Sequence, residues 1–488
     1  MGEPDRGRSL EDVDEQLVVG FDLDMTLIDT VPGFAATLAV LGAELGVELP
    51  IAELTGNLGP PLDLVLAPHV PAADVPAAIA RFREIYPGTA VTPTPATVGA
   101  AEALAAVRRH GGRTLLVTGK FTPNARLHVE HLGLDVDVVE GEVWGGAKGA
   151  VLRRHGAHLY VGDHVHDVEG ARAAGVPSVS VLTGGCTAQE LREAGTDVVL
   201  DDLTDFPAWL DEFVLAARLE RLETLLRGHE RVLVAFSGGA DSAFLLAAAV
   251  RALGPDRVGA ATAYSDSLPL SERDPARAFA ESLGVRVLTP QTHEMEREGY
   301  RANAGDRCAF CKSELLDVLG PLAAQEGYAV VATGTNADDA RAGFRPGIAA
   351  AADRGAVTPL LDAGLTKEQV RAASRAWDLP TWDKPAAACL SSRVAFGIEI
   401  TPRRLARVER AEADLRAALE AAGHPVRDLR VRDLGETARV EVDRDLVEVA
   451  RDHLAVVLAA GFAEAEVDPL GFRSGSMNSL LPDPERWR

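Results

Sequence analysis

Thiols are scarce in this chain, and two of them stand close together. Cys308 and Cys311 lie three apart in DRCAFCKSELL, and the 488 residues contain only four cysteines. A CxxC pair can bind zinc, bind part of an iron–sulfur cluster, form a redox disulfide or be two small buried side chains. A third thiol, Cys389, follows in AACLSSR, while Cys186 in LTGGCTAQE is interpreted as an incidental loop thiol. The spacing alone leaves these alternatives open.

Carboxylates at the ends of apolar strands form a second candidate site. Asp22 and Asp24 in FDLDMTL are two residues apart, so on a strand both side chains point the same way. One carboxylate can attack phosphorus while the other handles the proton of the leaving group. Three later motifs add polar side chains in order: Thr118 in VTGK, Lys148 in AKGAVL, and Asp163 with Asp167 in VGDHVHD. A phosphate beside several carboxylates would need a divalent cation and a lysine to offset repulsion.

In this order the motifs resemble those of haloacid dehalogenase (HAD) superfamily phosphatases, over residues 16 to about 205. The resemblance implies that Asp22 forms an aspartyl-phosphate and that Asp24 is the general acid and base. It also implies that Thr118 and Lys148 bind phosphate, and that Mg²⁺ is held by Asp22, Asp163 and Asp167. The helical pattern at about 32–95 predicts an inserted cap, like those of phosphoglycolate-phosphatase-type members, which closes over a small substrate.

A glycine-rich turn opens the second half of the chain. In VLVAFSGGADSAFLL an apolar strand precedes the turn and a helix follows it, so free N–H groups at the helix start can meet phosphates. SGGxDS resembles the PP-loop of ATP pyrophosphatases, and GxxxxGK[ST], the P-loop kinase motif, is absent. The resemblance implies that ATP is bound by five residues: Ser237, Gly238, Gly239, Asp241 and Ser242.

The motifs that follow, from DRCAFCKSELL through LRVRDLGETARVEVD to PLGFRSGSMNSLL, resemble LarE-type sulfur transferases over about 215–488. That family adenylates a carboxylate of pyridinium-3,5-biscarboxylate mononucleotide and replaces it with a thiocarboxylate, toward the nickel-pincer nucleotide of lactate racemase. The resemblance implies that Cys389 carries sulfur and that Arg430 and Arg432 hold the substrate phosphate, for which paired guanidinium groups are suited. It suggests that Asp383 and Lys384 position the adenylate.

The three thiols match one form of this family. Members with only the cysteine at Cys389 sacrifice its sulfur, whereas members with an added CxxC are implied to bind a [4Fe–4S] cluster. Three thiolates, here Cys308, Cys311 and Cys389, would leave one iron open to hydrosulfide. Zinc, a disulfide, and sacrifice of Cys389 are the alternatives.

The elements that must position these residues alternate between β-rich and helical stretches, which predicts an α/β fold with parallel sheets. We expect a HAD Rossmann-like domain with a helical cap at 1–214, a PP-loop adenine-nucleotide α-hydrolase-like domain at 215–399, and a small α+β substrate-binding subdomain at 400–488. A helix is expected at 215–230.

Composition limits the partners. The net charge of −24 disfavours nucleic acid binding, and the longest apolar run, AFLLAAAV, is too short to span a membrane. Four cysteines without a secretion signal predict the cytoplasm. Only five lysines occur against 44 arginines, and they cluster in the motifs. The resemblance implies a mononucleotide substrate, ATP and Mg²⁺ as cofactors, a nickel-insertion protein of the same pathway as partner, and a homo-oligomer.

Two alternatives concern the whole chain. A PP-loop enzyme could instead thiolate tRNA or form amides, with a structural zinc at the CxxC. The acidic chain disfavours binding of tRNA, and an amide synthase would not need three thiols. The first unit could be regulatory rather than catalytic. The fusion itself motivates the hypothesis that it acts on a related nucleotide or phosphorylated metabolite.

Overall fold

The computed structural model describes residues 16–56, 62–341, 346–385, 388–473 and 476–477. The chain forms two compact units, Met1–Ala217 and Arg218–Arg488. Their boundary lies inside helix α10, Phe206–Arg227, slightly beyond the predicted boundary at 214/215. The helix expected at 215–230 is therefore the second part of a longer one. Phe206 and Leu210 at its start are buried in the core of the first unit, and Leu222 and Leu226 near its end are also buried.

The first unit is built on a six-stranded parallel sheet of order β3-β2-β1-β4-β5-β6. The strands are β1 (Val18–Phe21), β2 (Arg113–Val117), β3 (Val138–Glu140), β4 (Leu159–Gly162), β5 (Ser178–Val181) and β6 (Val198–Leu200). The predicted α/β fold with a parallel sheet is confirmed for this unit. Since β1 lies between β2 and β4, where the strand order reverses, residues that follow these strands meet at a site where such sheets bind ligands.

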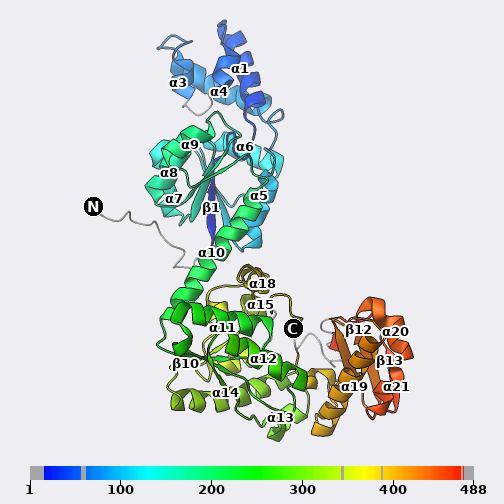
Figure 1. The fold of residues 1–488 in the computed structure, drawn as a ribbon. Helices are drawn as coiled ribbons and strands as arrows, with labels where there is room; N and C mark the ends of the chain where they lie inside the picture. The colour runs from blue at the N-terminus through cyan, green and yellow to red at the C-terminus, as the bar shows by residue number, and fades with distance from the viewer. Residues whose placement is uncertain (1–15, 57–61, 342–345, 386–387, 474–475, 478–488) are drawn as a thin grey trace. The chain divides into compact units, whose positions relative to one another are not determined.

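Helices cover both faces of this sheet (Figure 1). Side chains of α7 and α8 pack with one face and those of α5, α6 and α10 with the other. The helices are α5 (Ala100–Arg109), α6 (Thr122–Leu132), α7 (Lys148–Arg154), α8 (Val165–Ala174) and α9 (Ala188–Ala194), with a short 3₁₀ turn η2 (Gly145–Ala147).

Between β1 and β2 four helices form the predicted cap, with a small apolar core of their own. They are α1 (Val31–Leu45), α2 (Ile51–Gly56), α3 (Leu62–Leu66) and α4 (Val75–Thr89). Phe34 of α1 packs edge-on against Phe82 of α4, with ring centroids 5.6 Å apart, and Phe82 in turn contacts Tyr86. The aromatic contacts fix α1 and α4 against each other.

The second unit holds a four-stranded parallel sheet of order β10-β7-β8-β9, a second α/β layer as expected. The strands are β7 (Val232–Ala235), β8 (Val258–Ala261), β9 (Arg286–Leu288) and β10 (Val330–Thr333). The helices are α11 (Ala240–Leu253), α12 (Leu270–Ser282), α13 (Glu298–Arg301), α14 (Arg307–Gln325), α15 (Ala337–Arg341), α16 (Pro346–Ala352), α17 (Pro359–Asp362) and α18 (Lys367–Ala376), with 3₁₀ turns η3 (Pro255–Arg257), η4 (Glu294–Glu296) and η5 (Leu390–Arg393).

The last part of the second unit is a three-stranded sheet in which β12 lies between β11 and β13. β11 (Leu429–Asp433) is antiparallel to β12 (Thr437–Val442), and β12 is parallel to β13 (Glu464–Val467). Helix α19 (Pro402–Ala421) packs on this sheet. The turn η6 (Arg444–Leu446) and two short helices, α20 (Val447–Asp452) and α21 (Leu454–Ala459), connect β12 to β13.

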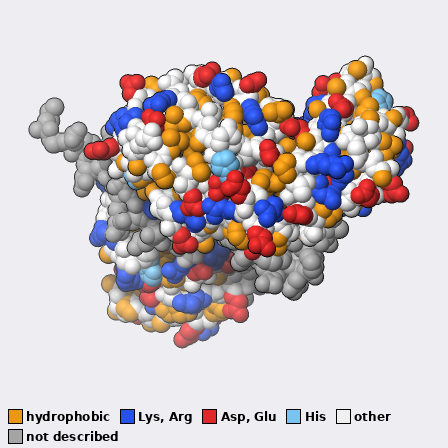
Figure 2. All heavy atoms as spheres, turned by 90° about the horizontal axis from the view of Figure 1, so that it is seen from below, with side chains coloured by type: hydrophobic (Ala, Val, Ile, Leu, Met, Phe, Trp, Pro, Cys, Tyr) orange, Lys and Arg blue, Asp and Glu red, His pale blue; other side chains and the backbone are white. Residues whose placement is uncertain are grey.

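On the face that Figure 2 shows, Lys and Arg side chains lie among Asp and Glu. In the part of the chain that the structure describes, no helix is long and apolar enough to cross a membrane.

Candidate active sites

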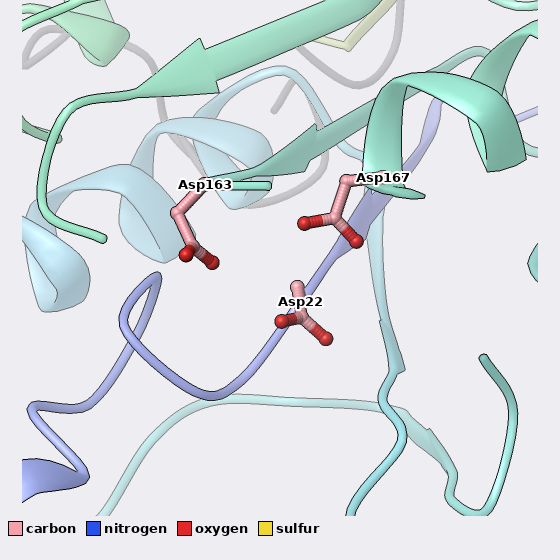
Figure 3. A group of neighbouring side chains, drawn as sticks. All are labelled: Asp22, Asp163 and Asp167. Atoms are coloured by element: carbon pink, nitrogen blue, oxygen red, sulfur yellow. The ribbon is translucent and has the colours of Figure 1, made fainter. Parts of the chain in front are cut away.

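Three carboxylates meet at the strand ends of the first unit (Figure 3). Asp22 follows β1, Asp163 follows β4, and Asp167 lies in the first turn of α8. One oxygen from each lies within 4.8 Å of those from the other two, and all three residues are buried. Because Mg²⁺ prefers carboxylate oxygens beside phosphate ligands, this donor set fits the Mg²⁺ that the motifs predict.

Two glycines let the backbone approach these carboxylates. A Cβ at Gly162 would overlap the carboxylate of Asp167, and a Cβ at Gly184 would overlap that of Asp163. Thr26 donates a hydrogen bond of 3.0 Å to Asp163. The acidic cluster is therefore held by its surroundings.

Lys148, the first residue of α7, is buried between two of the acids. Its Nζ lies 2.9 Å from Asp22 Oδ1 and 2.6 Å from Asp167 Oδ1, and it donates to the Tyr160 hydroxyl at 2.9 Å. Burial favours the neutral amine, but Asp167 and Asp22 outweigh it and raise the pKa of Lys148 well above its ordinary value. The cation is thus fixed where a phosphate bound at Asp22 would need it.

Burial also acts on the carboxylates. It raises the pKa of Asp22 to about 7, with opposition from Lys148, and raises the pKa of Asp163 well above its usual range. Neighbouring Asp167 adds to both shifts. A divalent cation bound by these oxygens would favour their ionised forms.

Asp24 has a different environment, dominated by a lysine that the motif analysis did not assign to the site. Lys120 Nζ lies 2.7 Å from Asp24 Oδ1, Thr118 Oγ1 lies 3.5 Å from Asp24 Oδ2, and the Thr30 hydroxyl also donates to Asp24. Burial would raise the pKa of Asp24, but Lys120 outweighs it and the pKa is lowered. Two features of the sequence could have pointed to Lys120: it follows Thr118 by two residues, and lysines are scarce in this chain.

The cap reaches this pair directly. Tyr86 of α4 accepts a hydrogen bond of 2.8 Å from Lys120 Nζ, and its hydroxyl lies 2.9 Å from Nε2 of His128. Burial lowers the pKa of His128 to about 4, so this imidazole is neutral near pH 7. A cavity of about 440 Å³ lies between core and cap and is lined by Asp22, Asp24, Thr118, Lys148, Asp163 and Asp167 together with cap residues.

In the second unit the turn after β7 has the form expected of a phosphate cradle. Gly238 has φ +74°, which favours glycine, and a Cβ there would lie 2.8 Å from the Ala276 methyl group. Ser242 at the start of α11 donates to the carbonyl of Gly239 at 3.1 Å, and its hydroxyl lies 3.1 Å from that of Ser237. Oδ1 of Asp241 is buried and has no hydrogen-bond partner among the described residues, and burial raises the pKa of this carboxyl.

This turn and two of the thiols line one cavity of about 350 Å³. Its walls include Ser237, Gly239, Asp241, Ser242, Cys311, Lys312 and Cys389. Burial raises the pKa of the Cys311 thiol, and neighbouring Cys389 adds to the effect, while burial lowers the pKa of Lys312. Glu294, also buried in this wall, accepts a hydrogen bond of 2.7 Å from Ser267 and was not found from sequence.

The CxxC lies in the first turn of α14, with Cys308 exposed and Cys311 partly buried. Among the described residues the three sulfur atoms of Cys308, Cys311 and Cys389 do not all lie within 4.8 Å of one another, as one zinc ion with Zn–S bonds of about 2.3 Å would require. Cys311 lies close enough to Cys389 and Cys308 for the charges of both to add to the rise in its pKa. Cys186 lies in the loop between β5 and α9 and is partly buried.

The RxR pair lies on β11, next to the segment of Cys389. Arg432 is buried and pairs with Glu441 through two hydrogen bonds of 3.0 and 2.7 Å; it also donates to the Ser392 carbonyl at 3.3 Å. Arg430 is half-buried, with its guanidinium 5.5 Å from the Phe472 ring centroid, and burial lowers its pKa. Arg393, missed from sequence although it follows Cys389 by four residues, donates to the Cys389 carbonyl at 2.9 Å.

Arg393 also pairs with Glu412 at 3.0 Å, and its positive charge acts on Arg430. Three arginines thus gather beside the Cys389 segment. Lys384 reaches the glycine-rich turn, where Nζ donates to the Gly238 carbonyl at 2.9 Å and pairs with Glu272 at 2.6 Å. A carboxylate oxygen of Asp383 lies 4.0 Å from the guanidinium of Arg427. Among the described residues, no hydrogen bond or ion pair joins Asp383 to the glycine-rich turn.

Fold and sites together define a chain of two enzyme units, a hydrolase of the haloacid dehalogenase type followed by an α/β unit in which a glycine-rich turn and two thiols line one cavity. The haloacid dehalogenase-like hydrolase family matches residues 19–172, and a second hydrolase family of the same kind matches 149–206. The second unit belongs to the family of pyridinium-3,5-bisthiocarboxylic acid mononucleotide synthase, the LarE-type family. That synthase, from Lactiplantibacillus plantarum, is 34% identical over 55% of this chain and 96% of its own length.

An uncharacterised protein of Synechocystis is 40% identical over 55% of this chain and 99% of its own length. The first unit is similar to tyrosine-protein kinase PtkA of Mycobacterium tuberculosis, 30% identical over 38% of this chain and 68% of that protein. It is also similar to a phosphoglycolate phosphatase of Cupriavidus necator, 31% identical over 40% of this chain and 93% of that protein. The first unit is thus a phosphatase domain of the HAD superfamily.

Proposed function

We propose that the second unit is an ATP-dependent sulfur transferase that acts on pyridinium-3,5-biscarboxylate mononucleotide, or on its half-converted product. The observation that carries the proposal is the shared cavity, in which the glycine-rich turn at Ser237–Gly239 and the thiols of Cys311 and Cys389 face the same space. An adenylating enzyme needs the activated carboxylate and the sulfur source within reach of each other.

The reaction has two balanced steps. A substrate carboxylate oxygen attacks the α-phosphorus of ATP, which forms an acyl-adenylate and releases pyrophosphate. Hydrosulfide then attacks the carbonyl carbon, the bond to AMP breaks, and a thiocarboxylate and a proton are released. The N–H groups at the start of α11 and the ammonium of Lys384 favour the phosphates in the first step.

The arginines beside Cys389 would hold the substrate. Arg430 and Arg432 would bind its phosphate, as the motif implies, while Arg393, which pairs with Glu412 and donates to the Cys389 carbonyl, would position the Cys389 segment. A [4Fe–4S] cluster held by Cys308, Cys311 and Cys389 would supply an iron able to accept sulfur, which would spare the protein's own thiols.

The test is the metal and sulfide content of protein purified without oxygen. We expect about four irons with matching acid-labile sulfide per chain, lost in Cys308→Ala and in Cys389→Ala. Cys186→Ala is the matched control, because this thiol lies in the other unit and should leave the iron unchanged. Zinc alone would contradict the cluster, and loss of the mass of H₂S from Cys389 on turnover would mean that the chain consumes its own sulfur.

For the first unit we propose Mg²⁺-dependent hydrolysis of a small phosphomonoester. Asp22 attacks phosphorus, Asp24 protonates the leaving oxygen and then accepts a proton from the water that hydrolyses the aspartyl-phosphate. Asp22, Asp163 and Asp167 would hold Mg²⁺, which supplies positive charge to the phosphoryl group, and Lys148 adds its own. The position of Lys148 between Asp22 and Asp167 carries this proposal, and Asp22→Asn should abolish phosphate release.

A further inference from the structure

The cap presents a mostly apolar wall to the cavity of the first unit. Ile79, Phe82, Arg83 and Tyr86 of α4 all line the cavity, and their spacing places them on one face of the helix. The other cap side chains of this wall include Phe34, Leu54, Leu62 and Val65. Since the phosphate must lie at the carboxylates of the core, the leaving group has to extend toward this apolar wall.

An aromatic group faces the cavity from the core side. The cavity is lined there by Trp144, His164 and His166. The ring centroid of His166 lies 4.2 Å from that of Trp144 and 4.7 Å from that of His164. Trp144 is 40% exposed, so part of its ring is open to a ligand. A planar ligand can stack on such a platform.

The charges of the wall argue against a second anionic group on the leaving side. Of the described cap residues that line the cavity, Arg83 is the one cation; it lies 3.8 Å from Glu142 and 4.4 Å from the Phe121 ring centroid. The cap also contributes Asp63 to the lining, while Lys120 is paired with Asp24. A carboxylate or second phosphate would meet few available positive charges there.

We propose, on the basis of the phosphomonoesterase activity proposed above, that the substrate is a phosphomonoester whose alcohol carries a planar aromatic ring, as in a mononucleotide. The phosphate lies at Asp22 and Lys148, and the ring lies between Trp144 and the α4 face. Hydrolysis breaks the P–O bond and consumes one water to give a nucleoside and inorganic phosphate. The two-carbon ester phosphoglycolate would leave most of the roughly 440 Å³ unfilled.

The test measures phosphate release by the full chain with Mg²⁺ from nicotinamide mononucleotide, AMP, ribose 5-phosphate, phosphoglycolate and pyrophosphate. A mononucleotide and ribose 5-phosphate differ by the ring alone, so the ratio of their kcat/KM values reports the ring. We expect a ratio of about ten or more for at least one mononucleotide. Equal kcat/KM values for mononucleotides and ribose 5-phosphate, or a preference for phosphoglycolate or pyrophosphate, overturn the inference about the ring but not the proposed phosphatase activity. No release from these esters or from p-nitrophenyl phosphate overturns both.

Two variants locate the ring. Trp144→Ala and Ile79→Ala should each lower the ratio several-fold toward 1, because each removes one side of the slot. Leu64→Ala is the matched control, since Leu64 lies in the cap helix α3, is 60% exposed and is not part of the lining. An unchanged ratio in both lining variants contradicts the proposed position of the ring.

Discussion

In the proposed reaction Asp22 must be ionised to attack phosphorus, but its burial next to other acids disfavours the ionised form in the absence of a cation. In the folded chain its pKa is about 7, against 3.8 ordinarily. The folded state therefore keeps a proton that the unfolded chain releases, and stability falls as pH rises from about 4 through 7.

Asp22→Asn should remove this part of the pH dependence. In EDTA, wild type should lose on the order of a few kcal/mol relative to Asp22→Asn between pH 4 and 7. The measurement is urea unfolding as a function of pH, and Mg²⁺ should reduce the difference. Asp201→Asn, the same change at an exposed position, is the control; a parallel pH dependence in wild type and Asp22→Asn would refute the assignment.

Lys120 holds Asp24 in its ionised form, so a neutral replacement should change how activity depends on pH. In Lys120→Met burial acts on Asp24 against little more than the Thr30 hydrogen bond, and the pKa of Asp24 rises. In the proposed reaction Asp24 must be protonated to donate to the leaving oxygen and ionised to accept the proton of water, so the alkaline limb of the kcat profile, and with it the acidic limb, should move to higher pH. Lys120→Arg keeps the charge and should shift these limbs less; identical profiles in all three proteins would exclude a role for Lys120 through Asp24.

At the scale of elements, the site depends on how closely β4 and α8 approach. Gly162 ends β4 against the Asp167 carboxylate, so Gly162→Ala must displace Asp167. We expect the Mg²⁺ concentration for half-maximal phosphatase activity to rise about tenfold or more. Gly88→Ala is the control, since a Cβ at Gly88 meets nothing within 4 Å. An equal effect of both substitutions would show that displacement of Asp167 is not the cause.

The elements also show what sequence could predict. Strands β1, β2 and β4 were predicted because each is an apolar run that ends in a polar motif, and the fold class is confirmed. β3, Val138–Glu140, was missed because three partly buried residues give too short a pattern. The start of α10 at Phe206 was missed although Pro207 suits a first helical turn.

Side-chain pairings across the fold were less accessible. Tyr86 meets Lys120 only because the cap folds onto the core, and the pairing of Arg432 with Glu441 depends on the register of β11 and β12. The spacing of a motif predicts which residues share one strand end or one turn. It does not predict which residues from distant parts of the chain tertiary packing brings into contact with them.

At the scale of the whole molecule, each unit has its own core and its own cavity. We therefore expect the two activities to be separable in the full chain. Asp22→Asn should leave ATP consumption within about twofold of wild type, and Cys389→Ala should do the same for phosphate release from esters. Both assays are run on both variants, and a loss of more than about tenfold in the unmutated unit would reveal coupling.

The junction of the units inside α10 bears on how the chain is turned over. Proteases cut readily at exposed loop tips, whereas the backbone around Ala217 is hydrogen-bonded helix. A nick there requires local unfolding of a helix that buries apolar side chains near both ends. The haloacid dehalogenase-type unit and the LarE-type unit are thus made in equal number, and cleavage that would separate them must first unfold part of α10.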